Sequence, residues 1–327
     1  MHSFFLIINY IGDIVKKIVC ILVLIIITIL FIKQTEQDLI GQRKKVEVLN
    51  FYKECMNKPF QSESTKQNIQ HFLNKYQQEY FGLYFDDLIN QYTILKNANK
   101  VYYGASLIKL LEAVYILDNH EIDLNTKLVY SYHNQKNYSL GMDKYLPGSV
   151  ITIKDLITYT IEVSDNTAHE ILLNYIGLET LRNYSLTLGM DLSISASDHY
   201  GYLTPEDCNK LLKTTYQLIS KNDEKSIFLK ELMNNPYYNA LSFEDITLIH
   251  KYGLYDNYYN DIGIYLGDYP YLISILTYFG KEDYTNKVQK ISQEIYEIYK
   301  NNLEEKENYC NQTNKKLYYN HIAEHKN

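Results

Sequence analysis

The sequence predicts a mixed α/β (α+β) domain with a five-stranded antiparallel sheet, flanking helices and a helical subdomain. Two short β-like runs, FGLYFDDL and QYTILKN, lie near the start of the regular part of the chain. Three more, DITLIHKYG, DIGIYLG and YLISILTYFG, lie near its end. Helical periodicity falls between the two groups. We therefore expect the N- and C-terminal segments to meet in one sheet.

The composition is that of a globular protein, with 327 residues of which 46% are hydrophobic. The net charge is −7, and no stretch gathers Lys and Arg on one face, which argues against nucleic acid as a partner. The 35 tyrosines are interpreted as a coding bias toward AT-rich codons, with a tyrosine-built binding surface as the alternative. No Cys-x-x-Cys pair occurs, and we interpret the four cysteines as incidental.

The N-terminus carries an unbroken apolar run from Ile18 to Ile32, preceded by two lysines and followed by no small-residue cleavage site. This pattern favours an uncleaved signal anchor, a single transmembrane segment, over a cleaved signal peptide. Basic residues on both sides of the run leave its orientation open. We expect four segments: the anchor over 1–33, a stalk over 34–64, the folded domain over 65–300 and a frayed polar tail over 301–327.

Helices within the domain are predicted from apolar spacing and from capping residues. Thr204-Pro205-Glu206-Asp207 is a helix start, with a capping threonine, proline at the first position and acids in the first turn. Gly177 ends another helix. The predicted helices are TKQNIQHFLNKYQQEY, SLIKLLEAVYILD, IKDLITYTI, the segment 167–176, CNKLLKTTYQLI and EDYTNKVQKISQEIYEIYKNN.

Ser106 and Lys109 lie on one side at the start of an otherwise apolar helix. Unpaired N–H groups and the helix dipole there favour negative charge, which suits a nucleophile whose attack creates an oxyanion. Apolar neighbours would desolvate Lys109 and lower its pKa, which would let it act as a base toward the serine. Glu112 could oppose this shift by pairing with Lys109. Ser-x-x-Lys also arises by chance, so alone it carries little weight.

Two further motifs carry chemically useful side chains. Ser164-Asp165-Asn166 lies between two helices and fits a helix cap. Its functional interpretation is a second hydroxyl that relays a proton and an amide that holds a substrate carbonyl. Lys251-Tyr252-Gly253 ends a β-like run, where the lysine offers a fixed charge and the glycine allows close backbone approach. An exposed strand edge there would bind an extended substrate by strand addition.

In this order the motifs resemble the Ser-x-x-Lys, Ser-Asp-Asn and Lys-Thr-Gly pattern of the β-lactamase and penicillin-binding protein superfamily, class A most closely. The resemblance extends from about Thr65 to about Asn301. It implies a β-lactamase/transpeptidase-like fold, no metal or organic cofactor, and acyl transfer on a β-lactam or a peptidoglycan-like D-Ala peptide. Such substrates imply an extracytoplasmic catalytic domain at the cell membrane, acting on or near the cell wall.

The resemblance also implies a role for each matching residue. Ser106 is the acylated nucleophile, Lys109 its base or proton shuttle, and Ser164 the relay to the leaving nitrogen. Asn166 orients the acyl amide, and Lys251 pairs with the substrate carboxylate.

The third motif departs from the family pattern. Tyr252 stands where the family has a short hydroxyl that helps to bind the carboxylate, and we expect the bulkier phenol to point its oxygen elsewhere. Gly253 and Leu254 continue the substrate-binding strand. The backbone N–H groups of Ser106 and Leu254 would form the oxyanion hole.

A second departure concerns the Ω-loop, whose Glu-x-x-x-Asn pattern supplies the deacylating base in class A enzymes. The corresponding stretch between Gly189 and Thr204, MDLSISASDHYGYL, is shorter and lacks this pattern. Glu206 already belongs to a capping turn. Asp198 and His199 are nearer, but we interpret them as loop residues rather than a replacement base. Acylation can then occur, and slow deacylation is expected.

The sequence thus predicts a membrane-anchored, extracytoplasmic serine hydrolase that acts through a Ser106 acyl-enzyme. One alternative is a penicillin-binding or sensor module that acylates once or only binds, which the missing glutamate and Tyr252 favour. The other is an inactive cell-surface scaffold that keeps the motifs by descent, against which the intact site residues argue. Turnover separates the enzyme from the sensor, and acylation separates both from the scaffold.

Overall fold

The computed structural model describes residues 2–191, 193–195, 198–244, 246–278 and 284–324. Contacts divide the chain into two compact units. The larger unit is Lys58–Lys306, and the smaller joins Met1–Asn57 with Glu307–Asn327. Each unit is described by itself below. The predicted boundaries of anchor, stalk, domain and tail stay predictions.

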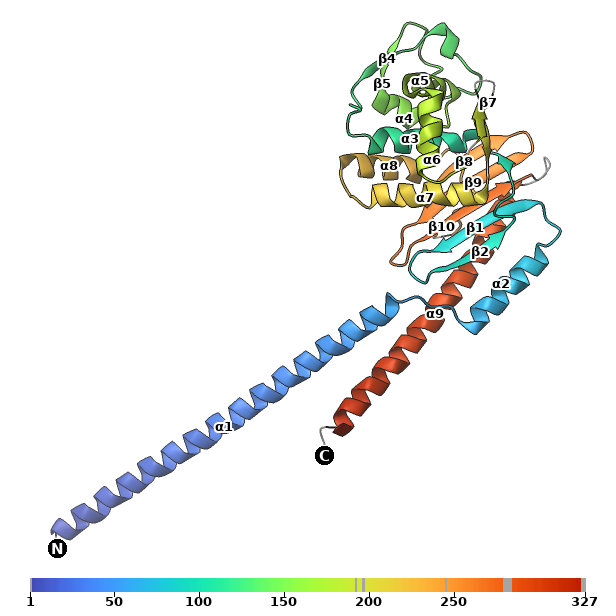
Figure 1. Ribbon diagram of the computed structural model, residues 1–327. Helices are drawn as coiled ribbons and strands as arrows, with labels where there is room; N and C mark the ends of the chain where they lie inside the picture. The colour runs from blue at the N-terminus through green and yellow to red at the C-terminus, as the bar shows by residue number, and fades with distance from the viewer. Residues whose placement is uncertain (1, 192, 196–197, 245, 279–283, 325–327) are drawn as a thin grey trace. The chain divides into compact units, whose positions relative to one another are not determined.

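The larger unit is built around a five-stranded antiparallel sheet in the order β2-β1-β10-β9-β8 (Figure 1). Its strands are β1 (Phe81–Asp87), β2 (Tyr92–Lys96), β8 (Leu248–Tyr255), β9 (Tyr258–Tyr265) and β10 (Tyr271–Thr277). β1 pairs with β10, so that Phe81 lies opposite Thr277. The predicted sheet from both ends of the domain is therefore confirmed. β8 lies at an edge, where one side of its backbone pairs with none of the strands that the structure describes.

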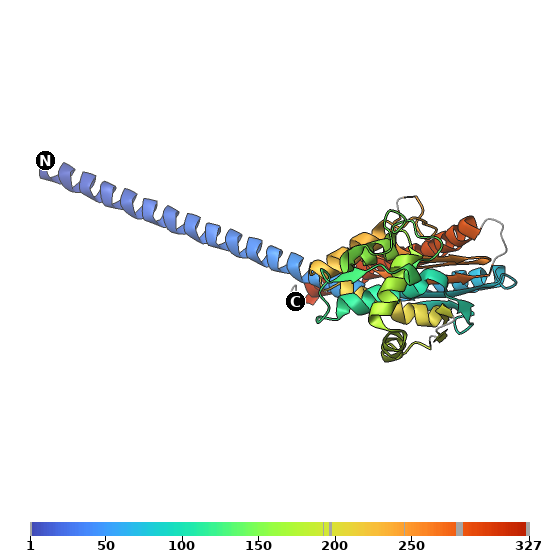
Figure 2. The ribbon, with the colours of Figure 1, turned by 90° about the horizontal axis from the view of Figure 1, so that it is seen from above.

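Helices cover both faces of the sheet because alternate strand residues point to opposite sides. On β10, Leu272 and Leu276 pack into one core with α3, α4, α5, α7 and α8, whereas Ile273 and Ile275 pack into a second core with α2 and the 284–306 part of α9. Figure 2 shows α7 and α9 on opposite sides of the strands. These helices are α2 (Glu63–Lys75), α3 (Ile108–Asp118), α4 (Ile153–Glu162), α5 (Asn166–Ile176), α7 (Pro205–Ile219), α8 (Glu224–Asn234) and α9 (Tyr284–Glu324).

The predicted helix start at Thr204 is confirmed by its side-chain bonds. The Thr204 hydroxyl accepts from the Asp207 N–H at 3.0 Å, and the Asp207 carboxylate accepts from the Thr204 N–H at 2.9 Å. This reciprocal capping box satisfies donors that a helix N-terminus leaves unpaired. Pro205 occupies the first turn, where its missing N–H costs nothing.

Several short elements were not predicted. They are β3 (Tyr102–Tyr103), β4 (Lys127–Val129), β5 (Val150–Thr152), β6 (Ser193–Ser195), β7 (Asp198–Leu203), α6 (Leu178–Thr187), α8 (Glu224–Asn234) and the 3₁₀ turns η1 (Ala105–Leu107) and η2 (Tyr132–Asn134). The interpretation of Asp198 and His199 as loop residues is wrong, because both belong to β7. This strand pairs with β3, so that Tyr102 lies opposite Leu203. A partner about a hundred residues away in the chain leaves no local signal in the sequence.

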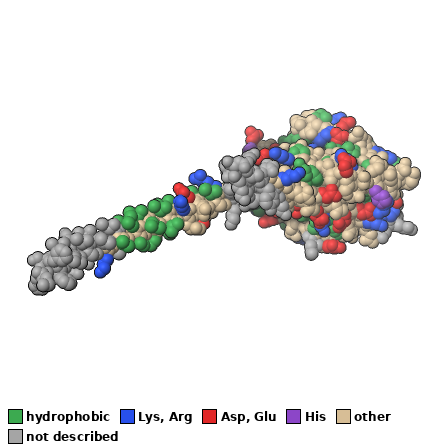
Figure 3. Space-filling model, turned by 90° about the horizontal axis from the view of Figure 1, so that it is seen from below, with side chains coloured by type: hydrophobic (Ala, Val, Ile, Leu, Met, Phe, Trp, Pro, Cys, Tyr) green, Lys and Arg blue, Asp and Glu red, His purple; other side chains and the backbone are tan. Residues whose placement is uncertain are grey.

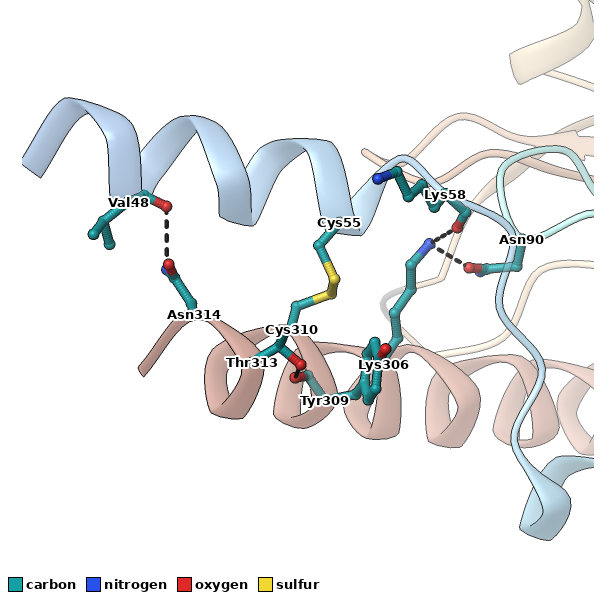
Figure 4. The surroundings of a disulfide bond; sticks show 9 residues. All are labelled: Val48, Cys55, Lys58, Asn90, Lys306, Tyr309, Cys310, Thr313 and Asn314. Carbon is teal, nitrogen blue, oxygen red and sulfur yellow. Dashed lines mark hydrogen bonds between the residues drawn. A yellow bond between two sulfur atoms is a disulfide. The ribbon is translucent and has the colours of Figure 1, made fainter. Parts of the chain in front are cut away.

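The smaller unit contains α1 (His2–Met56) and the 307–324 part of α9. A disulfide joins Cys55 to Cys310 with Cα atoms 5.8 Å apart, and Asn314 Nδ2 donates to the Val48 carbonyl at 3.1 Å (Figure 4). The interpretation of all cysteines as incidental is therefore wrong for these two. Cys208 is buried and free. The tail that was expected to fray over 301–327 is helical to Glu324, and its last residues, 325–327, lie outside the described residues.

The apolar run predicted as an anchor lies within α1. Its described apolar side chains between Val19 and Ile32 are exposed, and Figure 3 shows them as a continuous apolar stretch of the helix. Among the described residues, none of the helices combines the length and apolar character needed to cross a membrane.

Candidate active site

Ser106 lies in η1, directly before α3, on a segment that two other elements hold in place. Ala105 has a φ of +46°, a left-handed conformation that is unusual for a residue with a Cβ atom. The Gly104 N–H donates to the Gly201 carbonyl of β7 at 2.8 Å. The buried Asn260 of β9 donates its Nδ2 to the Tyr103 carbonyl at 2.8 Å. Strain of this kind persists only where surrounding contacts over-determine the backbone, and it clusters at functional sites.

Lys109 is fully buried one turn after Ser106, and its amine contacts several other polar groups of the site. Nζ lies 3.0 Å from Ser106 Oγ and 2.7 Å from Asn166 Oδ1. It also lies 2.6 Å from the Ser164 carbonyl oxygen and 3.3 Å from Ser164 Oγ. Burial lowers the pKa of Lys109 to about 7, although Glu112 and Asp165 act in the opposite direction. A large fraction of the amine is then neutral near neutral pH and can accept the Ser106 proton.

Glu112 does not pair with Lys109 as the sequence suggested. Its Oε2 lies 2.8 Å from Nδ1 of His169, and both side chains are fully buried. Burial raises the pKa of Glu112 well above its usual range and lowers that of His169 well below its usual range. Burial disfavours the charged form of each partner in this pair. Because Glu112 bonds His169, its carboxyl group forms no ion pair with Lys109 among the contacts of the described residues.

The Ser164-Asp165-Asn166 motif is fixed by its central carboxylate. Asp165 caps α5 by accepting from the Ala168 N–H at 2.8 Å. Its second oxygen accepts from the N–H groups of Gly141 and Met142 at 2.8 and 2.9 Å. The capping interpretation is confirmed, and the cap also holds the two neighbouring side chains at the site. Ser164 itself is left-handed, with a φ of +55°.

Lys251 of β8 approaches the same serine from the opposite side. It is fully buried, and Nζ donates to Ser164 Oγ at 3.0 Å and to the Tyr252 carbonyl at 2.8 Å. Burial and the nearby Lys109 lower the pKa of Lys251 well below its usual range. The Ser164 hydroxyl thus stands between two lysines, in a position that suits a proton relay.

Tyr252 is turned toward the site, contrary to our expectation that its oxygen points elsewhere. Its side chain is buried and lies edge-on to Tyr238, with ring centroids 5.3 Å apart. Burial raises the pKa of Tyr252, and the nearby Ser164 side chain acts against that shift. Lys251 Nζ lies 4.1 Å from the ring centroid. The phenol therefore occupies space beside the two groups that would meet a substrate carboxylate.

Gly253 allows β8 to pack against the segment that carries Ser106. A Cβ atom at this position would lie 2.7 Å from the Gly104 carbonyl oxygen and 3.2 Å from the Leu107 nitrogen. The predicted close backbone approach is confirmed. Leu254 follows at the edge strand and is 36% exposed. The two residues predicted to form the oxyanion hole therefore lie on adjacent segments.

The structure brings Ser106, Lys109, Ser164, Asn166 and Lys251 into one hydrogen-bonded group. Sequence reasoning missed Asn260, although two polar residues together in an otherwise apolar strand were a usable signal. Asp261 beside it is buried and lies 2.7 Å from His250 Nδ1. Within the described ranges, no group of three or more His, Cys, Asp or Glu side chains is arranged to hold a metal ion.

Comparison with known proteins gives one family and many related structures. The family model described as "Beta-lactamase enzyme family" matches residues 64–299. No curated protein matches the chain.

Three solved structures illustrate the structural likeness. A mutant of PBP-A in an acyl-enzyme complex with penicillin G has 17% identity and a TM-score of 0.64, covering 74% of this chain and 99% of its own. The TLA-1 extended-spectrum β-lactamase has 20% identity and a TM-score of 0.64, covering 72% and 99%. A β-lactamase from Sphaerobacter thermophilus has 18% identity and a TM-score of 0.61, covering 73% and 97%. These likenesses confirm the predicted β-lactamase/transpeptidase-like fold.

Proposed function

The chain belongs to the β-lactamase enzyme family, and on that premise we propose that it is a serine hydrolase acting through an acyl-enzyme at Ser106. The substrate class is a β-lactam or a peptidoglycan-like D-Ala peptide. One observation carries the proposal. The buried Lys109 amine lies 3.0 Å from Ser106 Oγ, and its pKa is lowered to about 7. A base matched to neutral pH next to a hydroxyl is the arrangement that activates a serine nucleophile.

Acylation follows from the contacts of three groups. The neutral Lys109 amine accepts the Ser106 proton while Oγ attacks the substrate carbonyl carbon. The carbon–nitrogen bond then breaks, and the Ser164 hydroxyl delivers a proton to the leaving nitrogen. Ser164 is reprotonated from Lys109, whose Nζ lies 3.3 Å from its Oγ. Backbone N–H groups of Ser106 and Leu254 would stabilise the oxyanion.

Substrate binding rests on Lys251 and Asn166. The pKa of Lys251 is lowered by burial and by Lys109, so a substrate carboxylate would restore its positive charge on binding. Asn166 would hold the acyl amide through its side chain, which already bonds the Asn137 carbonyl at 2.8 Å. The PBP-A mutant forms its acyl-enzyme with penicillin G, which supports this compound as a probe for the present chain.

Release of the acyl group is proposed to be slow. The described part of the segment between Gly189 and Thr204 forms β6 and β7, and its sequence has no Glu-x-x-x-Asn pattern. Glu206 lies in the first turn of α7, 3.4 Å from Lys210. The acyl-enzyme should therefore accumulate, as in a penicillin-binding protein.

The location is proposed to be extracytoplasmic at the cell membrane. The Cys55–Cys310 disulfide supports it, because disulfides form and persist in oxidising compartments. The run of exposed apolar side chains between Val19 and Ile32 is the feature that supports single-pass anchoring, although the described part of α1 falls short of a full span. Alkaline extraction of membranes and protease treatment of whole cells test both points. Extraction into the soluble fraction would contradict the anchor, and full protection from protease would contradict the orientation.

The deciding experiment is intact-mass spectrometry of the full chain mixed with penicillin G. Ser106→Ala is the test variant, and Ser220→Ala, at the exposed end of α7, is the matched control. A persistent adduct in the wild type and in Ser220→Ala, absent from Ser106→Ala, is expected. Fast Ser106-dependent hydrolysis without an adduct would contradict slow release. Intact penicillin without an adduct would leave two interpretations: an inactive scaffold, or a hydrolase that acts on another ester or amide.

The sensor alternative is favoured by one observation, the buried Tyr252 beside Ser164 and Lys251. A module that acylates once needs no exit for product. Counting the molar equivalents of penicillin consumed separates the two, since a sensor stops at one equivalent.

A further inference from the structure

A second group of titratable side chains lies beside the Ser106 site and takes no part in acylation. It contains Glu170 of α5, His199 of β7, and Lys136 in the loop between η2 and β5. His199 Nε2 lies 3.3 Å from Glu170 Oε2, and Lys136 Nζ lies 3.5 Å from the same oxygen. A carboxylate held against one nitrogen of an imidazole is the arrangement that orients a catalytic histidine.

Two independent observations connect this pair to Lys109, the neighbour of the nucleophile. Glu170 follows Asn166 by one helical turn on α5, so both side chains project from the same side of the helix. Asn166 Oδ1 in turn contacts Lys109 Nζ at 2.7 Å. On β7, the ring of Tyr200 lies 5.7 Å from Lys109 Nζ and 5.0 Å from the ring of His199.

The strand that carries His199 also touches the nucleophile segment directly. β7 pairs with β3, and the Gly201 carbonyl accepts from the Gly104 N–H at 2.8 Å. A Cβ atom on Gly104 would lie 3.0 Å from the Tyr200 carbonyl oxygen. The wall formed by β7 therefore stands against the residues that lead into Ser106.

The contacts of His199 suit a base. Its Nε2 and Glu170 Oε2 are buried atoms, and neither forms a hydrogen bond with the described residues. The His199 side chain is nevertheless 17% exposed, so atoms other than Nε2 reach the surface. Burial lowers the pKa of His199, which keeps the imidazole neutral near neutral pH and leaves one nitrogen able to accept a proton.

Neighbouring candidates are already engaged. Asp198 Oδ1 accepts from the Gly201 N–H at 3.4 Å within its own turn, and its carboxylate hydrogen-bonds Tyr103. Glu112 and His169 are fully buried and bond each other. His199 alone among these combines partial exposure with an orienting carboxylate.

We propose that His199, oriented by Glu170, is the general base that activates water to release the acyl group from Ser106; this inference rests on the proposed function. The water oxygen attacks the acyl carbon while His199 accepts one water proton on the nitrogen remote from Glu170. The tetrahedral intermediate collapses by breaking the bond from carbon to Ser106 Oγ, and the proton taken up by His199 passes through solvent and the neutral Lys109 amine to Ser106 Oγ. The product is the free carboxylic acid, and His199 and Lys109 both end in the neutral forms in which they began.

The test follows release of a preformed adduct in the full chain. Wild type, His199→Gln, Glu170→Gln and the control His133→Asn are acylated with penicillin G, freed of excess reagent and followed by intact mass. Glutamine keeps an amide near the position of Nε2, and His133 is an exposed histidine in η2. We expect His199→Gln to slow release about 100-fold and Glu170→Gln to slow it about tenfold, with His133→Asn unchanged. Acylation rates should stay within about twofold, which also shows that the variants are folded.

The pH profile of release adds a readout that a structural role would not move. The groups that face His199 are Glu170 and His169 of α5, Glu112 of α3 and Lys136. Glu170 and Glu112 raise its pKa, whereas His169 and Lys136 lower it. Release should fall as His199 becomes protonated at low pH. In Glu170→Gln this acid limb should move to lower pH, because the carboxylate that favours the charged imidazole is gone.

The outcomes separate this inference from the proposed function. A normal adduct whose release is unchanged in His199→Gln overturns the role of His199 and leaves the acyl-enzyme intact. An unmoved acid limb in Glu170→Gln overturns the orienting role of Glu170. A wild type that never forms an adduct overturns the proposed function, and this inference with it.

Discussion

The two walls of the Ser106 site differ in how completely their polar groups are satisfied. On the wall formed by α3, β8 and the Ser164 turn, Lys109 and Lys251 both bond side chains and backbone at 2.6–3.3 Å. On the wall formed by β7 and α5, His199 Nε2 and Glu170 Oε2 face each other at 3.3 Å without hydrogen bonds to described residues. The first wall is preorganised for one reaction, and the second keeps two buried polar atoms whose hydrogen-bonding capacity is unused among the described residues.

This difference explains why acylation and release should proceed at different rates. Preorganised dipoles and bases cost no reorganisation at the moment of reaction, which favours attack by Ser106. The wall formed by β7 and α5 must still bind and orient the water that releases the acyl group, which costs free energy in each turnover. Substitutions on the first wall should therefore change adduct formation, and those on the second should change adduct lifetime.

The largest expected effect comes from removing Lys109, the proposed general base for acylation. Lys109→Met keeps the volume of the buried side chain but cannot accept the Ser106 proton. We expect adduct formation with penicillin G to slow by about 10²–10⁴-fold. Intact-mass measurements on samples quenched at successive times give the rate of adduct formation. Lys127→Met, at the exposed start of β4, is the control. A rate within tenfold of wild type would assign the base to another group.

The second effect is a pH dependence of the same step. The pKa of Lys109 is about 7, and the neutral amine is the active form. Acylation should therefore be nearly constant well above pH 7 and fall about tenfold per pH unit well below it. Adduct formation measured across buffers of constant ionic strength tests this. A rate that stays flat through this range would falsify the assignment of Lys109 as the base.

A third effect concerns Tyr252 and the rate of adduct formation. Tyr252 fills space beside Ser164 and Lys251. Tyr252→Thr should raise the rate of adduct formation about tenfold, because a short hydroxyl leaves room for a carboxylate at Lys251, a gain of about 1.4 kcal/mol in barrier. Tyr252→Phe removes only the hydroxyl and serves as the matched control. A slower Tyr252→Thr would mean that the phenol itself contributes to binding.

The smallest effect on adduct formation is expected from breaking the disulfide of the smaller unit. Cys55→Ser breaks the bond to Cys310. We expect adduct formation to stay within about twofold, while the free energy of unfolding falls by about 2–5 kcal/mol. Denaturation followed by circular dichroism measures the loss, and Cys208→Ala controls for removing a thiol. A large drop in acylation would mean that the disulfide supports the site.

Features with a local cause were predictable from sequence. The five strands showed their apolar runs, Thr204 and Asp165 showed their capping chemistry, and Gly253 marked a close backbone approach. Ser106 and Lys109 were predictable neighbours because one helical turn separates them. Each of these depends on residues within a few positions in the chain, where periodicity and capping rules apply.

Features that depend on distant partners were decided by the tertiary structure. Glu112 bonds His169 instead of Lys109, Tyr252 turns toward Ser164, and Cys55 finds Cys310 only because folding brings them together. The sequence alone determined which chemical groups are available and which turn or strand carries each. Burial, which shifts the pKa of Lys109 and leaves His199 facing Glu170, is a property of the packed chain and has no signature in the order of residues.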